Sequence, residues 1–221
     1  MNPLQALRSP EHSLLCSPIG LKTIDSFTSG EPLAPLRVRV DVQVGAAWLE
    51  TSLQPTRTPS GMLTLPGIGR RFNPTTNFTQ QRYRLRIECA EYIAEYRSTT
   101  DGFEFFVPPY DDLNPPAIPN ANVRNLALHP SPNYPFGGAV RVVHGRVREA
   151  NASPVRDAVI EFNGLDRVMT DERGEFAFGL RRAPVNGPIV LDVHHDRSGR
   201  SQSFTLQLPA ALQANQVLTL V

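Results

Sequence analysis

Apolar and polar residues alternate along many short segments of this chain, which is the period of a strand with one buried face. In the first half these segments are residues 36–44, 61–67, 82–90 and 102–109. In the second half seven short segments follow, with turn residues every ~8–12 positions, as in a β-sandwich. They are residues 139–150, 157–163, 167–170, 174–180, 188–196, 203–209 and 216–221. The pattern predicts an all-β protein.

A proline-rich stretch, PPYDDLNPPAIPNANV, separates the two groups of strands and shows no periodicity. Because each proline fixes φ, it predicts a stiff, extended linker. The polar N-terminus contains proline, and the sequence leaves open whether it is ordered by itself or becomes ordered on binding a neighbouring subunit. We therefore predict an N-terminal arm, a first sandwich, a linker and a second sandwich, at residues 1–17, 18–109, 110–138 and 139–221.

The two halves repeat one order of features. GEPLAPLRVRV is followed by TPSGMLTLPG in the first half, and ASPVRDAVIEF by TDERGEFAFGL in the second. Each pair has a proline-containing approach to an alternating strand, then a threonine and a glycine, then a second alternating strand. This order predicts two related sandwiches in tandem.

Composition narrows the classes of function. The 221 residues are 40% hydrophobic and carry a net charge of +1, which does not favour nucleic-acid binding. No stretch approaches the ~20 apolar residues of a membrane span. The N-terminus lacks the pattern of a secretory signal, so we expect synthesis in the cytoplasm and leave open later incorporation into a released particle. The two cysteines, Cys16 and Cys89, fit a reducing compartment at least as well as a disulfide.

Two polar clusters could hold a metal ion, and both have a simpler interpretation. Asp171 and Glu172 precede Gly174, and this spacing favours a hairpin turn over a calcium loop. His194 and His195 are adjacent, so on a strand they point to opposite faces and cannot easily share one ion. The chain also lacks a G-x-S-x-G motif and a phosphate-binding loop. We expect no catalytic, cofactor or metal site.

Alternating arginines are the main candidate for a binding surface. If their strands are neighbours, five side chains share one sheet face: Arg37, Arg39, Arg82, Arg84 and Arg86. One interpretation is a solvated face neutralised by nearby acids. The other is a docking surface for an acidic partner subunit.

The second half resembles a known family. VHGRVREANASPVRDAVIEFNGLDRVMTDERGEFAF is similar to the carboxypeptidase regulatory-like domain, a small transthyretin-like sandwich, over residues 140–221. The first half resembles transthyretin and hydroxyisourate hydrolase more weakly. That enzyme has a histidine where this chain has Lys22, and its terminal Tyr-Arg-Gly-Ser is matched only by Tyr96, Arg97 and Ser98 in mid-chain. The resemblance therefore implies the fold without the activity.

The tandem also looks like accessory proteins of contractile injection systems and phage-tail-like particles, through PGIGRRF, YRLRIECAEY, DGFEFFVPPYDD and NYPFGGAVRVVHGRV. This resemblance implies a non-catalytic structural or adaptor subunit with protein partners and no cofactor. Whether the chain also forms a homo-oligomer is left open. The alternatives are a carbohydrate- or surface-binding module and, disfavoured by Lys22, a hydroxyisourate-type hydrolase.

Overall fold

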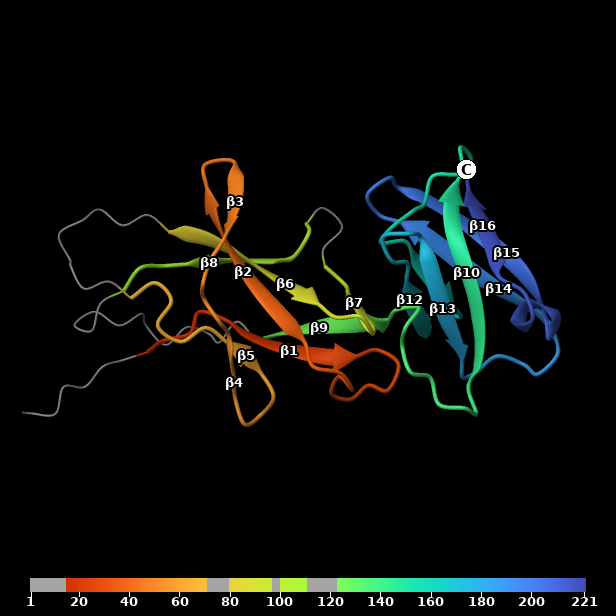
Figure 1. The fold of residues 1–221 in the computed structure, drawn as a ribbon, viewed down its shortest axis with the longest axis horizontal. Coiled ribbons are helices and arrows are strands. Elements are labelled where there is room, and N and C mark those ends of the chain that lie inside the picture. The colour runs from red at the N-terminus through yellow and green to blue at the C-terminus, as the bar shows by residue number, and fades with distance from the viewer. Residues whose placement is uncertain (1–14, 71–79, 97–99, 111–122) are drawn as a thin grey trace, which may run out of the picture.

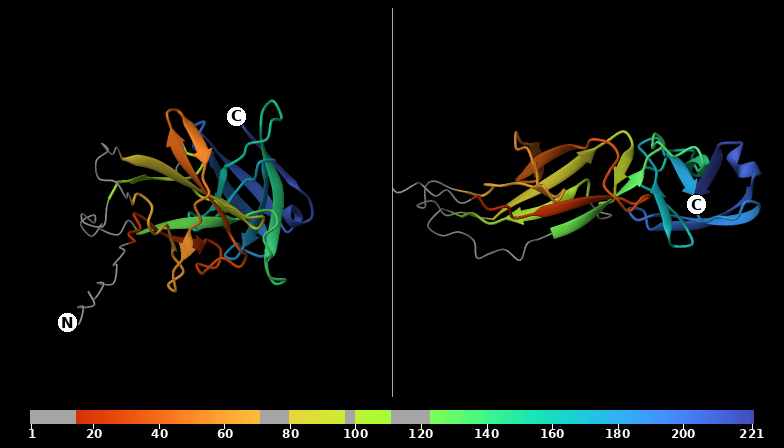
Figure 2. Two further views of the ribbon diagram at one scale, coloured as in Figure 1. Left: turned by 60° about the vertical axis from the view of Figure 1, so that its left-hand side comes forward. Right: turned by 90° about the horizontal axis from the view of Figure 1, so that it is seen from below.

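The computed structural model describes residues 15–70, 80–96, 100–110 and 123–221, and these ranges form strands, turns and one short 3-10 helix (Figure 1). The predicted all-β class is confirmed. Two bodies of strands lie end to end along the longest axis, as the view from below also shows (Figure 2). No helix within the described ranges is long and apolar enough to cross a membrane.

The first module consists of two sheets. One has the order β4-β5-β1-β9-β7 and contains Thr56–Arg57, Leu63–Thr64, Gly20–Asp25, Val123–Pro130 and Tyr92–Ala94 in that order. The other has the order β3-β2-β6-β8 and contains Ala47–Glu50, Arg37–Val44, Gln81–Glu88 and Phe103–Val107. Apolar side chains between the sheets, such as Leu21, Val40, Leu85 and Leu128, are almost completely buried.

The second module has a similar two-sheet arrangement. Its three-stranded sheet, β13-β10-β16, contains Glu175–Leu180, Arg141–Glu149 and Gln216–Leu220. Its four-stranded sheet, β12-β11-β14-β15, contains Asp166–Met169, Val159–Phe162, Gly187–His195 and Arg200–Leu208, and the 3-10 helix η1 (Ala210–Leu212) connects β15 to β16. Phe176 and Phe178 lie in its core, which is separate from that of the first module.

Both modules follow the same path through their sheets. The first strand pairs in parallel with the last, as β1 with β9 and β10 with β16. On its other side the first strand pairs antiparallel with β5 or β13. The second strand lies between β3 and β6 in one module and between β12 and β14 in the other. The first module adds only β4 and β7. This common topology agrees with the repeat of features in the sequence.

The segment predicted as a linker, residues 110–138, is partly a strand. Residues 123–130 form β9, which pairs with β1 over six positions and lies inside its sheet. Leu126 and Leu128 of β9 are buried in the first module. Prolines before and after this short apolar run made it resemble a linker. Residues 111–122 of the predicted linker lie outside the described residues, as do residues 1–14 of the predicted arm.

The turn predicted at Asp171 is confirmed. Asp171 Oδ1 accepts the backbone N–H groups of Arg173 and Glu175, at 2.9 and 2.8 Å. Gly174 has φ of +71°, and a Cβ at this position would lie 2.4 Å from the carbonyl oxygen of Val147. Only glycine fits so close to a neighbouring strand in this conformation.

A buried carboxylate, Asp25, stands at the end of the first module that faces the second. Its Oδ1 accepts the N–H groups of Phe27 and Thr28, at 2.8 and 3.3 Å. Its Oδ2 accepts the hydroxyl groups of Tyr92 and Tyr134, at 3.1 and 2.8 Å. Burial raises the pKa of Tyr92 to about 12, so this tyrosine remains a donor at neutral pH. Asp25 thus joins β1, the following loop, β7 and the segment that leads into the second module.

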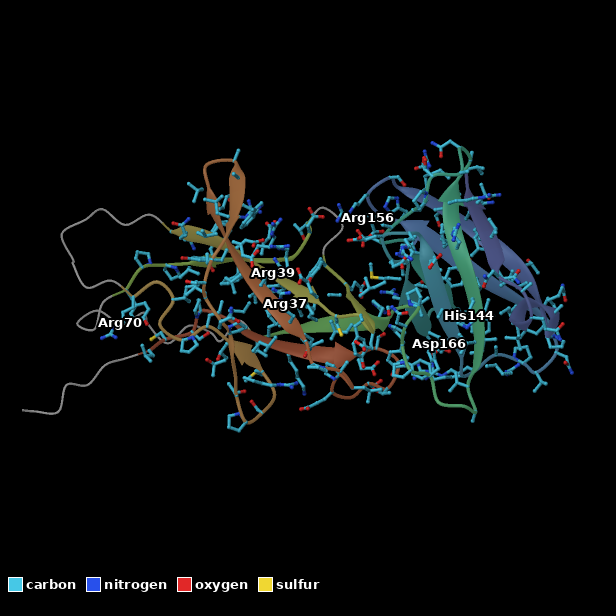
Figure 3. The ribbon with its side chains drawn as sticks, in the orientation of Figure 1. Arg37, Arg39, Arg70, His144, Arg156 and Asp166 are labelled. Atoms are coloured by element: carbon cyan, nitrogen blue, oxygen red, sulfur yellow. The ribbon has the colours of Figure 1, made fainter. Side chains whose placement is uncertain are left out.

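Aromatic rings beside this carboxylate pack against the second module. Phe27 and Phe136 lie edge to face, with ring centroids 5.1 Å apart. A Cβ at Gly179 of β13 would lie 2.7 Å from the Phe27 ring and 2.6 Å from the Phe136 ring, so the absence of a side chain there allows the close approach. The guanidinium of Arg181 stands 4.5 Å from the Phe27 ring centroid and bonds Asp166, which Figure 3 labels at this junction.

Polar contacts add to the junction. His129 of β9 is buried, with Nε2 2.9 Å from Glu95 Oε2 and Nδ1 3.0 Å from Ser26 Oγ. Arg167 of the second module donates to Glu95 Oε1 at 3.0 Å. The hydrogen bond with His129 is the main cause of a lowered pKa of Glu95, which stays ionised at neutral pH. Arg197 in turn reaches back to Asp101, at 2.7 Å.

Replacing Asp25 tests whether this carboxylate organises the junction. Asp25→Ala leaves two buried hydroxyls and two N–H groups without their acceptor, so we expect the free energy of unfolding to fall by about 2–4 kcal/mol. Urea denaturation followed by fluorescence measures the change. Asp192→Ala is the matched control, because Asp192 is exposed on β14 and its loss should cost less than about 0.5 kcal/mol. Equal losses in the two variants would contradict the prediction.

Candidate docking face

Strand register brings the five predicted arginines onto one outer face of the β3-β2-β6-β8 sheet. Arg39 stands opposite Arg86, and Asp41 opposite Arg84. Residues directly opposite each other in an antiparallel pair share a face, and alternation along β2 and β6 adds Arg37 and Arg82. Arg37 and Arg39 are labelled on β2 in Figure 3. We call this surface the docking face.

Asp41 lies at the centre of the docking face, and its side chain is only 2% exposed. Arg84 donates to Oδ2 through Nε and Nη2, at 2.9 and 2.7 Å. Arg86 donates to both carboxylate oxygens, at 2.7 and 2.9 Å. Burial by itself raises the pKa of Asp41, but the hydrogen bonds and charges of Arg86 and Arg84 together outweigh burial and lower it. The two arginines are therefore held by one permanent anion.

Three glutamates complete the pairing of charges. Arg39 bonds Glu50 at 2.8 Å and Glu88 at 2.7 Å. Arg82 forms an ion pair with Glu104. Five arginines thus meet four carboxylates, which leaves a net charge of only +1 on the face. With a net charge of +1 the face has only a weak electrostatic attraction for an acidic partner. It would therefore recognise a partner mainly by shape and local contacts. The interpretation as a docking surface stays a prediction.

Two aromatic side chains on the same face were not anticipated from the sequence. The guanidinium carbon of Arg84 stands 4.6 Å from the ring centroid of Trp48. That of Arg82 stands 5.7 Å from both Trp48 and Phe106. Phe106 remains 56% exposed. The sequence does contain a sign of this position. Glu104 and Phe106 are two residues apart in FEFF, so on a strand the Phe106 ring lies on the same face as the Glu104 carboxylate.

The remaining candidate residues lie apart from this face. Lys22 is exposed on β1. Tyr96 accepts the N–H of Ile87 at 2.6 Å, and burial raises its pKa to about 12. Arg97 and Ser98 lie outside the described residues. His195 Nδ1 bonds Ser198 within the hairpin after β14, at 2.9 Å. In the described ranges, no three His, Cys, Asp or Glu residues are placed to hold a metal ion.

A groove of about 610 Å³ runs between the modules and includes Cys89, Asp101 and Arg197 in its walls. Cys89 Sγ lies 3.1 Å from Glu91 Oε2, and burial raises the pKa of this thiol. A thiol with a raised pKa is a weak nucleophile at neutral pH. Several charges in the groove, among them Glu95, Asp101 and Arg197, belong to the ion pairs of the junction, so the docking face is the better candidate for a binding site.

Comparison of the chain with models of protein families gave no match, and neither did comparison with curated proteins.

The ion pairs of Asp41 predict a pH dependence of stability. Because the folded state lowers the pKa of Asp41, its contribution is complete above the unfolded value near 3.8 and is lost as the pH falls through the lower folded value. Asp41→Asn should therefore cost about 1–3 kcal/mol at pH 7 and progressively less in acid. Thermal unfolding of both proteins between pH 7 and pH 2 measures this difference. A gap that stays constant across the range would contradict the role given to Asp41.

Proposed function

We propose that this chain is a non-catalytic structural or adaptor subunit of a multiprotein particle, which docks through the face defined above, through edge strands and through the N-terminal arm. The observation that carries the proposal is the combination of Trp48, Phe106 and ion-paired arginines on one outer sheet face. Tryptophan and arginine are enriched among the residues that dominate the energy of protein interfaces.

The ion pairs prepare this face for a partner. Arg84 and Arg86 are fixed by Asp41, and Arg39 by Glu50 and Glu88. Side chains that are already fixed lose less conformational entropy on binding. The nearly neutral charge also means that a partner need not be strongly acidic. We therefore propose a partner with a flat surface that offers carbonyl or carboxylate acceptors around an apolar centre.

The two modules suit a role as a spacer or adaptor. Their junction is fixed by the Asp25 cluster, by Phe27 and Phe136 against β13, and by ion pairs from Arg167 and Arg197. A junction of this kind keeps two binding surfaces at a constant separation, which an assembly requires. The finer assignments, transthyretin-like modules and a contractile injection or phage-tail-like particle, rest on the sequence resemblance alone and belong to the proposal.

A second candidate is a carbohydrate- or surface-binding module. Trp48 and the exposed ring of Phe106 favour it, because sugars stack on aromatic rings. Arg84 covers one side of Trp48, however, which leaves less of the ring for stacking. A hydroxyisourate-type hydrolase is less favoured, since Lys22 stands where that enzyme has its histidine.

Particle association in the native cells tests the proposal. We expect tagged wild-type chain to sediment with a large complex in a density gradient. Trp48→Ala combined with Phe106→Ala should lower the sedimenting fraction at least tenfold, because it removes the two aromatic rings of the face. Deletion of residues 1–14 tests the arm separately and spares Cys16, whose backbone carbonyl bonds Gly67.

The matched control for this experiment is His144→Ala combined with Arg146→Ala. Both residues are exposed on β10 of the second module. Figure 3 shows His144 far from Arg37 and Arg39 of the docking face. The control variant should sediment as the wild type does. If the Trp48 and Phe106 variant also does so while remaining folded, the docking face is not the site of attachment. Stoichiometric binding of an oligosaccharide array that requires Trp48 would favour the second candidate.

A further inference from the structure

The last strand of the second module, β16, has an unpaired edge. Among the described residues it pairs only with β10. Its counterpart in the first module, β9, is covered on the same side by β7, which pairs antiparallel from Tyr92 opposite Pro130 to Ala94 opposite Leu128. The second module has no such strand, because β14 and β15 are joined directly by a short hairpin. The common topology therefore marks a place where one antiparallel strand can be added.

This edge lacks the features that normally prevent strand addition. Exposed edges are usually protected by charged side chains, prolines or bulges. From Ala210 to Val221 the sequence is AALQANQVLTLV, without a charge or a proline. Val217 is 52% exposed. The backbone N–H of Val221 takes a side-chain acceptor, Gln202 Oε1, at 3.3 Å. Gln202 belongs to β15, the edge strand of the other sheet, so a side chain of that sheet reaches the end of β16.

The sequence of the edge is self-complementary. Residues 217–221 read VLTLV, a palindrome centred on Thr219. In an antiparallel pair across a twofold axis at Thr219, Val217 lies opposite Val221 of the second copy, and Leu218 opposite Leu220. Every residue then meets an identical one on the same face, and matched β-branched pairs and threonine pairs stabilise antiparallel strands. No like charges are brought together on the strand itself.

We propose that β16 is a self-association edge, through which two copies of this chain join antiparallel around Thr219 into one continuous six-stranded sheet. The nearest charge on the neighbouring strand is Arg148, whose Nε lies 3.3 Å from Thr219 Oγ1. In the dimer the two copies of β10 stand three strand spacings apart, roughly 14 Å, but each guanidinium extends over Thr219 toward the axis, so the two charges lie closer than this and their repulsion weakens the dimer at low salt. The interface is separate from the docking face, and neither requires the other.

The interface is small. Five-residue strands cover less area than a standard stable interface, so the dimer forms at high protein concentration or where a particle already holds two copies close together. The opposite edge strand, β15, provides a comparison. It is longer and begins at Arg200, which bonds Glu149 at 2.9 Å, and its sequence RSQSFTLQL is not a palindrome. We do not expect β15 to pair with itself.

A disulfide across the twofold axis tests the register. In a background of Cys16→Ser and Cys89→Ser, Thr219→Cys brings two identical thiols face to face in the dimer. We expect mild oxidation to give a disulfide-linked dimer in most of the protein, resolved by non-reducing electrophoresis. Thr205→Cys is the matched control, since Thr205 is exposed on β15, and it should remain monomeric at the same concentration. Equal rates of cross-linking for the two variants would overturn the proposal.

A second variant distinguishes specific pairing from chance collision. Val217→Lys combined with Val221→Lys places four ammonium groups around the axis, and added to Thr219→Cys it should slow cross-linking at least tenfold. Both valines are exposed, so the melting temperature should stay that of the Thr219→Cys protein, which confirms that the module is folded. Cross-linking at an unchanged rate in the folded lysine variant would also overturn the proposal. Either result leaves the docking face untouched, because particle sedimentation tests that face independently.

Discussion

The buried carboxylate of Asp25 is the interaction on which the arrangement of the two modules depends. A carboxylate without water needs hydrogen-bond donors for its oxygens, and this one receives two backbone N–H groups and two tyrosine hydroxyls. These donors come from three separate parts of the chain. Satisfying one charge therefore fixes the loop after β1, strand β7 and the segment around Tyr134. The rings of Phe27 and Phe136, which contact the second module, are positioned by the same requirement.

On the docking face, too, one buried carboxylate fixes the positions of the groups that donate hydrogen bonds to it. Asp41 is buried under the arginines that it binds, and its charge determines where Arg84 and Arg86 lie. Arg84 in turn lies over Trp48. A row of flexible cations becomes an ordered surface because a single anion lies beneath it. The polar network thus provides order, while the apolar core beneath, including Val40 and Leu85, provides most of the stability.

The class of fold could be predicted from the sequence because alternation reports which side chains are buried. The hairpin at Asp171 could also be predicted, since its turn chemistry is local. Strand β9 could not, because its partner β1 lies about a hundred residues away and nearby prolines resemble a linker. The docking face was found in part: alternation grouped the arginines, but only the register revealed Asp41 between Arg84 and Arg86. The contribution of Trp48 also depends on pairing between distant strands.

In both modules the first strand pairs in parallel with the last. During synthesis β1 must therefore wait until residue 130 has left the ribosome, and β10 until residue 220. Until then each first strand exposes one unsatisfied edge, and loop closure over such a separation is slow. The nascent chain is thus most vulnerable to wrong pairing just before each module closes. Because the first module is completed before the second has been synthesised, the second module pairs its first and last strands beside a module that is already folded.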